Sequence, residues 1–165
     1  MRPVVLRLLE HCREPLVALD LTGVELVNSS FSDEVLALPL QRLCGGEFGE
    51  RYLTVLSPSA EVIQDAQLPL EKRDLTMMVF VGEAVGGEWH LLGAQKSYFD
   101  VTLREIMRAG SLATGDLAKA LDISLQNCSN RLTELSKRRL VQREREFGVR
   151  GGQTHANRSL LNLAV

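Results

Sequence analysis

The apolar positions in the first part of the chain form two kinds of segment. In some, short runs are almost entirely apolar, which is typical of buried strands. In others, apolar residues recur at helical spacing. The expected strands are residues 14–21, 51–57, 75–84 and 88–93, and the expected helices are residues 4–12, 30–46 and 59–67. Strands separated by helices of this length predict an α/β domain in which helices pack on a small mixed sheet.

Local signals refine the helix expected at residues 30–46. Ser30 or Ser32 can accept a hydrogen bond from one of the free N–H groups at its start. Pro39 should kink the helix or end its first part, because proline lacks an N–H and its ring clashes with the preceding turn. The segment before this helix, residues 23–27, is expected to be a short connection with strand character.

The pattern changes after residue 95. Three helical segments follow, and we expect Asp100 to cap the first and Gly110 to end it. Two strand-like segments separated by a glycine-rich turn then predict a β-hairpin. The segments are residues 100–109, 114–121 and 124–139 for the helices, and 141–146 and 154–163 for the strands. The predicted domains are therefore residues 1–95 and 96–165.

The third helix of the second domain carries the main candidate chemistry. Cys128, Leu132 and Leu135 are spaced as one buried stripe. The other faces hold amides and hydroxyls, which can hydrogen-bond base edges in a DNA major groove. The predicted base contacts are Gln126, Asn127, Ser129 and Asn130. The predicted phosphate or wing contacts are Ser124, Arg131, Lys137, Arg138, Arg139, Arg150 and Arg158. The alternative is a solvated helix end, or a domain of this kind that binds only protein.

Charge is distributed unevenly along the chain. Residues 1–97 hold 8 Lys and Arg against 14 Asp and Glu, a balance of −6. Residues 98–165 hold 11 against 7, a balance of +4, and the two sum to the overall −2. Opposite signs in the two parts favour two modules, with the basic one facing a polyanion.

Residues 112–146, "LATGDLAKALDISLQNCSNRLTELSKRRLVQRERE", closely resemble the winged helix-turn-helix of bacterial transcriptional regulators. The resemblance covers residues 100–163 and implies that residues 124–135 form the recognition helix. It also implies a wing near residues 147–155, with Arg150 close to its tip and able to enter the minor groove. Asp122 stands where that family usually has Gly, so the turn can be built differently. Operators mirror protein symmetry, so we expect a homodimer on double-stranded DNA.

Residues 17–36, "VALDLTGVELVNSSFSDEVL", resemble the STAS domains of anti-sigma-factor antagonists. The resemblance covers residues 4–81 and implies that Ser30 is phosphorylated by a partner kinase, although Asn28 and Phe31 depart from the pattern. In the simpler interpretation, Ser29 and Ser30 only cap a helix. The resemblance leaves an alternative function: a partner-switch protein that binds a kinase, an ATPase or another regulatory protein.

Other classes of function find little support in the sequence. The three cysteines and three histidines are scattered, so neither a disulfide framework nor a metal site is expected. Cys128 lies on the buried stripe, which favours a buried thiol over a redox switch. No catalytic or cofactor-binding motif appears, and we expect neither an enzyme nor a cofactor. No apolar run reaches the roughly 18–20 residues that span a bilayer, and the start of the chain does not resemble a signal peptide. The expected location is cytoplasmic, with no membrane partner.

Overall fold

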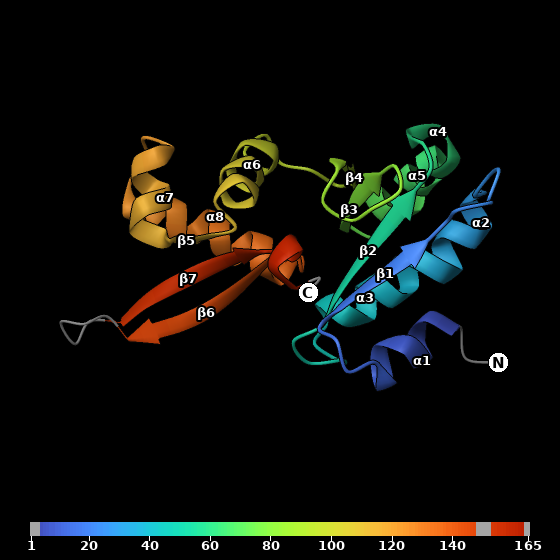
Figure 1. The fold of residues 1–165 in the computed structure, drawn as a ribbon, viewed down its shortest axis with the longest axis horizontal. Helices are drawn as coiled ribbons and strands as arrows, with labels where there is room; N and C mark the ends of the chain where they lie inside the picture. The colour runs from blue at the N-terminus through green and yellow to red at the C-terminus, as the bar shows by residue number, and fades with distance from the viewer. Residues whose placement is uncertain (1–3, 148–152, 164–165) are drawn as a thin grey trace. The chain divides into compact units, whose positions relative to one another are not determined.

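A computed structural model describes residues 4–147 and 153–163 of the chain. The fold divides into two compact units (Figure 1), the first ending at Gln95 and the second beginning at Lys96. Each unit has its own sheet.

The first unit is built on a four-stranded mixed sheet. Its strands are β1 (Leu16–Asp20), β2 (Tyr52–Ser57), β3 (Thr76–Val81) and β4 (Glu88–Gly93), adjacent in that order. The first three run parallel, and β4 is antiparallel to β3. Every residue of β2 is buried, as expected for a central strand covered on both faces. The small mixed sheet that the sequence predicts is therefore present.

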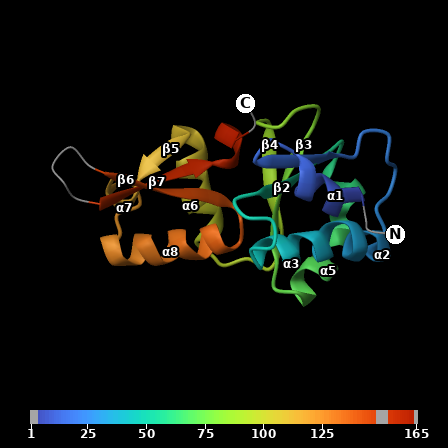
Figure 2. The same ribbon diagram turned by 90° about the horizontal axis from the view of Figure 1, so that it is seen from below.

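Helices supply most of the remaining core of this unit. They are α1 (Val4–His11), α2 (Ser29–Phe31), η1 (Ser32–Ala37), α3 (Leu38–Cys44), α4 (Ala60–Ile63), η2 (Gln64–Ala66) and α5 (Gln67–Lys72). Figure 2 shows α3 and α5 on one side of the strands. Val55 and Val79 of the sheet belong to one buried cluster with Leu40 of α3 and Leu70 of α5. Burying such side chains contributes about 1.5–3 kcal/mol each.

Pro39 neither ends its helix nor breaks it. The segments α2, η1 and α3 follow one another without interruption, and η1 has the wider π-helical turn, in which the Leu38 N–H donates to the Asp33 carbonyl. Pro39 then falls at the start of α3. A wider turn before the proline leaves room for its ring, which would clash with the carbonyl four residues earlier in a regular α-helix.

The start of this helix also differs from the sequence prediction. Asn28 is the capping residue, because its Oδ1 accepts a hydrogen bond from the Phe31 N–H at 2.9 Å. Ser32 is buried, and its hydroxyl donates to the Asn28 carbonyl at 2.9 Å. Neither Ser30 nor Ser32 is therefore the cap. The preceding residues, 23–27, form no strand.

The second unit combines three helices with a small antiparallel sheet. The helices are α6 (Phe99–Ala109), α7 (Thr114–Ala120) and α8 (Leu125–Lys137), and the strands are β5 (Ser111–Ala113), β6 (Val141–Phe147) and β7 (Gln153–Ser159). The strand order is β5-β7-β6. Two details differ from the prediction: β5 was not expected, and the segment after β7 is a short 3-10 helix, η3 (Leu160–Leu163), instead of more strand.

Backbone geometry explains how these helices begin and turn. Asp100 does not cap α6: it lies inside the first turn, where it pairs with Arg104 at 2.7 Å. The turn between α7 and α8 places Asp122 at φ +51°, the left-handed region that glycine usually occupies. Aspartate tolerates this region better than most other residues. The departure from glycine therefore does not prevent a left-handed turn.

Candidate nucleic-acid interface

The phase of α8 is fixed at its start and along its buried face. The Ser124 hydroxyl accepts a hydrogen bond from the Asn127 N–H at 3.2 Å, which caps the helix. Cys128, Leu132 and Leu135 are fully buried, so the structure confirms the predicted core stripe. The phase of the helix then decides which side chains point outward.

Four side chains lie on the side of α8 opposite the buried stripe. We call them the outward stripe: Gln126, Asn130, Thr133 and Lys137, all exposed and spaced at helical intervals. The Gln126 amide donates to Asn130 Oδ1 at 3.0 Å. This face thus presents amide and hydroxyl groups along most of its length and a cation at its end. Amides of this kind can pair with adenine edges, and lysine can contact phosphates.

The flank of α8 that faces α6 is held by arginine–aromatic contacts. The Arg131 guanidinium lies 4.9 Å from the centre of the Tyr98 ring, and its Nε donates to Asn127 Oδ1 at 3.2 Å. Arg138 lies 5.5 Å from the Phe99 ring centre. These cation–π contacts attach the helix to the start of α6.

Arg138 is not presented as a ligand contact. Its side chain is only 11% exposed, and its Nε donates to Glu134 at 2.9 Å. Lys96 also pairs with Glu134, at 3.1 Å. A guanidinium held in this way stabilises the helix end, and a phosphate contact by Arg138 stays a prediction.

The opposite flank of α8 is held from the hairpin by one arginine. Arg143 of β6 donates from one terminal nitrogen to the Ser129 hydroxyl at 3.0 Å and from the other to the Thr133 hydroxyl at 2.8 Å. Ser129 is half-buried and already occupied as an acceptor, which distinguishes it from the other predicted base contacts. Arg143 Nε is buried and has no hydrogen-bond partner among the described residues. Burial lowers the pKa of this guanidinium below its ordinary value.

Cationic side chains share the face of the hairpin that looks toward α8. Val141 is buried, so the alternation of a strand places Arg143 and Arg145 on the same face. His155 lies opposite Arg145 in the register of β6 and β7. Burial, followed by the charges of Arg143 and Arg145, lowers the pKa of His155. The sequence prediction missed this group, although the period-two pattern beginning at Val141 could have located both arginines.

A pocket of about 360 Å³ opens beside this group. Its lining comes from α7 and the residue before it, from α8 and from the hairpin: Ala113, Thr114, Gly115, Asp116, Leu125, Ser129, Arg143 and His155. Asn157 of β7 supports the α7 side, because its amide donates to the Leu112 carbonyl and the Thr114 hydroxyl at 3.0 and 3.2 Å. The pocket therefore has fixed walls and one cationic side.

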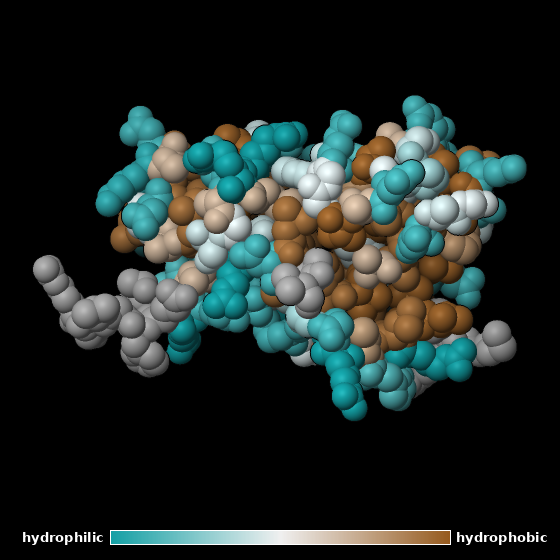
Figure 3. Space-filling view, viewed as in Figure 1, coloured by the Kyte–Doolittle hydropathy of each residue, from teal (hydrophilic) through white to brown (hydrophobic). Residues whose placement is uncertain are grey.

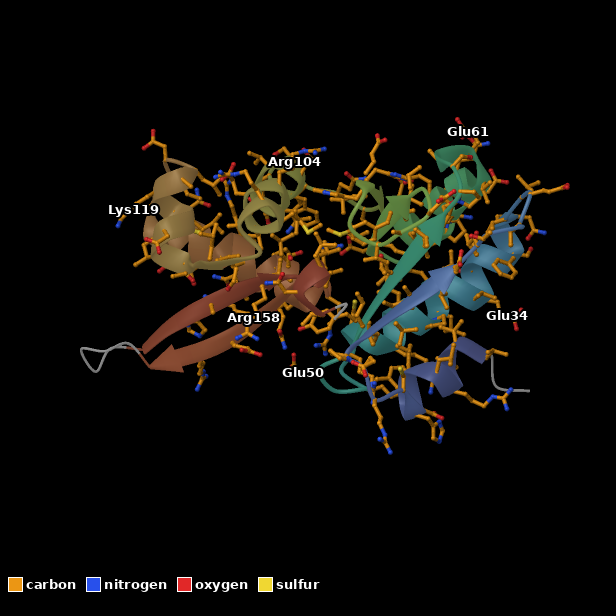
Figure 4. The ribbon with its side chains drawn as sticks, in the orientation of Figure 1. Glu34, Glu50, Glu61, Arg104, Lys119 and Arg158 are labelled. Carbon is orange, nitrogen blue, oxygen red and sulfur yellow. The ribbon has the colours of Figure 1, made fainter. Side chains whose placement is uncertain are left out.

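The remaining predicted contacts differ in exposure. Ser124 and Lys137 are exposed, and Arg139 is partly exposed with φ +59°. Arg158, labelled on β7 in Figure 4, pairs with Glu144 at 3.2 Å, which reduces the charge available to a ligand. Arg150 and the tip of the expected wing, residues 148–152, lie outside the described residues.

In the first unit, Ser29 and Ser30 are exposed in the first helical turn. A pocket of about 430 Å³ lies beside them, lined also by Asp33, Glu34, Leu68, Pro69 and Lys72. In Figure 4, Glu34 extends away from the ribbon, so part of the pocket's acidic charge faces solvent. Because Asn28 provides the cap, these serines are not caps, and phosphorylation of Ser30 stays a prediction.

The two units also differ in the hydrophobicity of their surfaces. Figure 3 shows hydrophobic side chains gathered over α1, where Val4 and Leu8 are exposed one helical turn apart. The visible surface of the hairpin is mostly hydrophilic.

The described part of the chain contains no cluster of side chains able to hold a metal ion, and none of its helices has the length and hydrophobicity needed to cross a bilayer. Cys128 is a buried thiol whose pKa is raised by burial.

Three helices, with the third exposed beside a two-stranded hairpin, are the elements of a winged helix-turn-helix domain. Residues 101–148 match the model of the MarR family. The match supports the helix-turn-helix part of the sequence prediction and indicates a regulator of transcription that binds DNA. It does not extend to the first unit, and nothing in the comparisons supports a STAS-like domain or a kinase or ATPase partner. No curated protein and no solved structure matches the chain.

Proposed function

We propose that α8 enters the major groove of DNA and that Gln126 and Asn130 of the outward stripe contact bases. The observation that carries this proposal is the separation of roles around α8. Its buried stripe packs in the core, and both flanks are held by arginine contacts. Gln126, Asn130 and Lys137 of the outward stripe are exposed away from these contacts, whereas Thr133 also accepts a hydrogen bond from Arg143. A helix fits the major groove, about 12 Å wide.

The phosphate contacts proposed around this helix come from both of its ends. Ser124 can donate its hydroxyl at the start, and Lys137 and Arg139 can meet the backbone at the end. Asn127 and Arg131 lie at the edge of the outward stripe, bonded to each other, and either can turn toward a groove edge. Arg158 of β7 and Arg150, which lies outside the described residues, remain proposed wing contacts.

We further propose that the protein acts as a homodimer. One helix reads only one half-site, and paired half-sites one helical turn apart mirror a two-fold axis. In this proposal residues 96–165 are the DNA-binding domain, and residues 1–95 form the domain that dimerises or receives a signal. Residues 1–95 hold 7 Lys and Arg against 14 Asp and Glu, and this balance of −7 argues against direct contact of that domain with DNA.

Selection of bound sequences from a random DNA pool, with the full-length protein at physiological salt, tests function and symmetry together. The expected result is an enriched inverted repeat with half-sites about 10 base pairs apart, centre to centre. Enrichment of a single half-site would contradict the dimer and leave the regulator intact. Retention of DNA without any enriched sequence would contradict base reading by α8.

A further inference from the structure

We infer that the pocket between α7, α8 and the hairpin is a seat for one phosphate group, held by Arg143. The group can be a phosphodiester of the DNA backbone or a free phosphate ester, since both offer the same oxygens. Binding of a DNA phosphodiester in this pocket rests on the proposed function, whereas binding of a free phosphate ester does not. Such a phosphate would add a contact on the flank of α8 that Arg143 holds, beside the outward stripe.

The charge of Arg143 has no described anion to compensate it. Arg143 is partly buried, and its described acceptors are two neutral hydroxyls, with no carboxylate among them. Its Nε is buried and has no hydrogen-bond partner within residues 4–147 and 153–163. A cation removed from water is costly unless an anion compensates it. An oxyanion is the natural complement to a guanidinium, because its oxygens match the guanidinium fork.

Several hydrogen-bond donors converge on the same pocket. Ser129 and His155 line it together with Arg143, and Arg145 is exposed on the same face of β6. Hydroxyls, imidazoles and guanidinium groups all donate to phosphate oxygens. The one carboxylate in the lining, Asp116, lies 3.8 Å from the Lys119 ammonium, which offsets its repulsion of an anion.

Part of the pocket wall is apolar. Leu125 is 60% exposed at the start of α8 and lines the pocket with Ala113. At about 360 Å³ the pocket is larger than a bare phosphate ion needs. A sugar next to the phosphate would cover Leu125, so the shape favours a phosphate carried on a pentose over inorganic phosphate alone.

The salt dependence of duplex binding tests whether the phosphate held by Arg143 belongs to DNA. The binding constant of the full-length protein for a duplex is measured over a series of salt concentrations for wild type, Arg143→Gln and Arg143→Lys. Losing one phosphate contact lowers the slope of log K against log salt by about 0.9, which we expect for Arg143→Gln. Arg143→Lys keeps the charge and should keep the slope. The control is Arg108→Gln on α6, whose side chain is 75% exposed and pairs with Glu105.

The second measurement needs no substitution, so it stands even if Arg143→Gln fails to fold. Inorganic phosphate, and separately the duplex, is titrated into the wild type while NMR follows the imidazole of His155 and the Nε–H of Arg143. Sodium chloride at matched ionic strength is the reference. Saturable shifts with phosphate but not with chloride support the seat, and the same shifts with the duplex assign its occupant to DNA.

The outcomes separate this inference from the proposed function. In one outcome the wild type binds DNA, but Arg143→Gln keeps the full slope and phosphate acts like chloride. The phosphate seat is then absent, and the proposed DNA-binding function is unaffected. If no DNA is bound and phosphate still gives saturable shifts, the seat holds a free phosphate ester and the regulator fails. An effect of phosphate no stronger than that of chloride, together with no DNA binding, would overturn both.

Discussion

Two helices of this chain share a design and differ in what they offer to a ligand. The helix of residues 29–44 and α8 each begin at a polar cap, each bury an apolar stripe and each leave polar side chains exposed. On the first helix, Asp33 is held by a bidentate pair with Arg73, and Glu34 is exposed. On α8, arginines hold the flanks and amides remain outside. The exposed side chains, more than the helix itself, decide which polymer can approach.

The contacts that hold each helix explain the difference. Arg73 donates to the carboxylate of Asp33 and to the amide oxygen of Gln41, so a carboxylate compensates its charge, and Glu34 stays exposed on the same helix. Around α8, Arg131 is held by an aromatic ring and an amide oxygen, and Arg143 by hydroxyls. Those partners do not neutralise the cations, so the net positive charge remains near the outward stripe. An anionic polymer is attracted to cations that no carboxylate compensates.

The largest expected effect comes from removing a buried contact of α8. Leu132 is fully buried, and Leu132→Ala should destabilise the second unit by about 2–5 kcal/mol through lost burial and a cavity. Urea unfolding of the full-length protein measures the loss. Leu125→Ala on the same helix is the matched control, because its side chain is 60% exposed. Equal losses for the two variants would contradict the phase of the helix.

A smaller effect is expected for an amide of the outward stripe. Asn130→Ala should reduce discrimination between the selected sequence and unrelated DNA by about 1–3 kcal/mol, because a bidentate contact to one base is lost. Fluorescence anisotropy with both duplexes measures the ratio of binding constants. Ser30→Ala, an exposed position on the first helix, should leave the ratio unchanged. A ratio unaffected by Asn130→Ala would remove this residue from base reading.

Much of the second unit could be predicted from the sequence. Cys128, Leu132 and Leu135 gave the phase of α8, because helical spacing alone fixes which side is buried. Helical spacing could not predict which residues contact the two flanks of α8. That Ser129 meets Arg143 depends on how β6 packs against α8, which involves residues 14 positions apart in the chain. Spacing likewise predicts Arg138 as a phosphate contact but cannot predict its packing against the Phe99 ring, which depends on tertiary structure.

The first unit shows where local signals mislead. Ser30 and Ser32 are good capping residues by propensity, yet Asn28 takes the position. Pro39 predicts a kink or an end of the first part of the helix. The helical segments instead continue through it, after the π-helical turn of η1, which no single residue predicts. The alternation of strands and helices predicted the mixed sheet, because that argument depends on long segments. Short signals need the neighbouring backbone before they can be interpreted.

A change in salt dependence should follow the loss of the cation at the end of the outward stripe. Lys137→Ala should weaken binding to all duplexes alike and lower the slope of log K against log salt by about 0.9, because one phosphate contact is lost. Binding measured over a salt series with specific and unrelated DNA checks this. Lys72→Ala, an exposed lysine of the first unit, should change neither quantity. A loss confined to the selected sequence would place Lys137 at a base instead.

The smallest expected effect is a change in stability from a substitution on the helix of residues 29–44. The hydrogen bonds and charge of Arg73 lower the pKa of Asp33 below its ordinary value of 3.8. The stabilisation is therefore complete above that value and is lost as the pH falls through the lower pKa of the folded state. The pair is partly exposed, so Asp33→Asn should cost less than about 1 kcal/mol at pH 7, and the difference from wild type should shrink below pH 3.8. Urea unfolding at several pH values measures it, with Glu34→Gln as the exposed control on the same turn. A difference that grew as the pH fell would mean that the Asp33 carboxylate opposes folding, and that the first helix is not held through its acidic face.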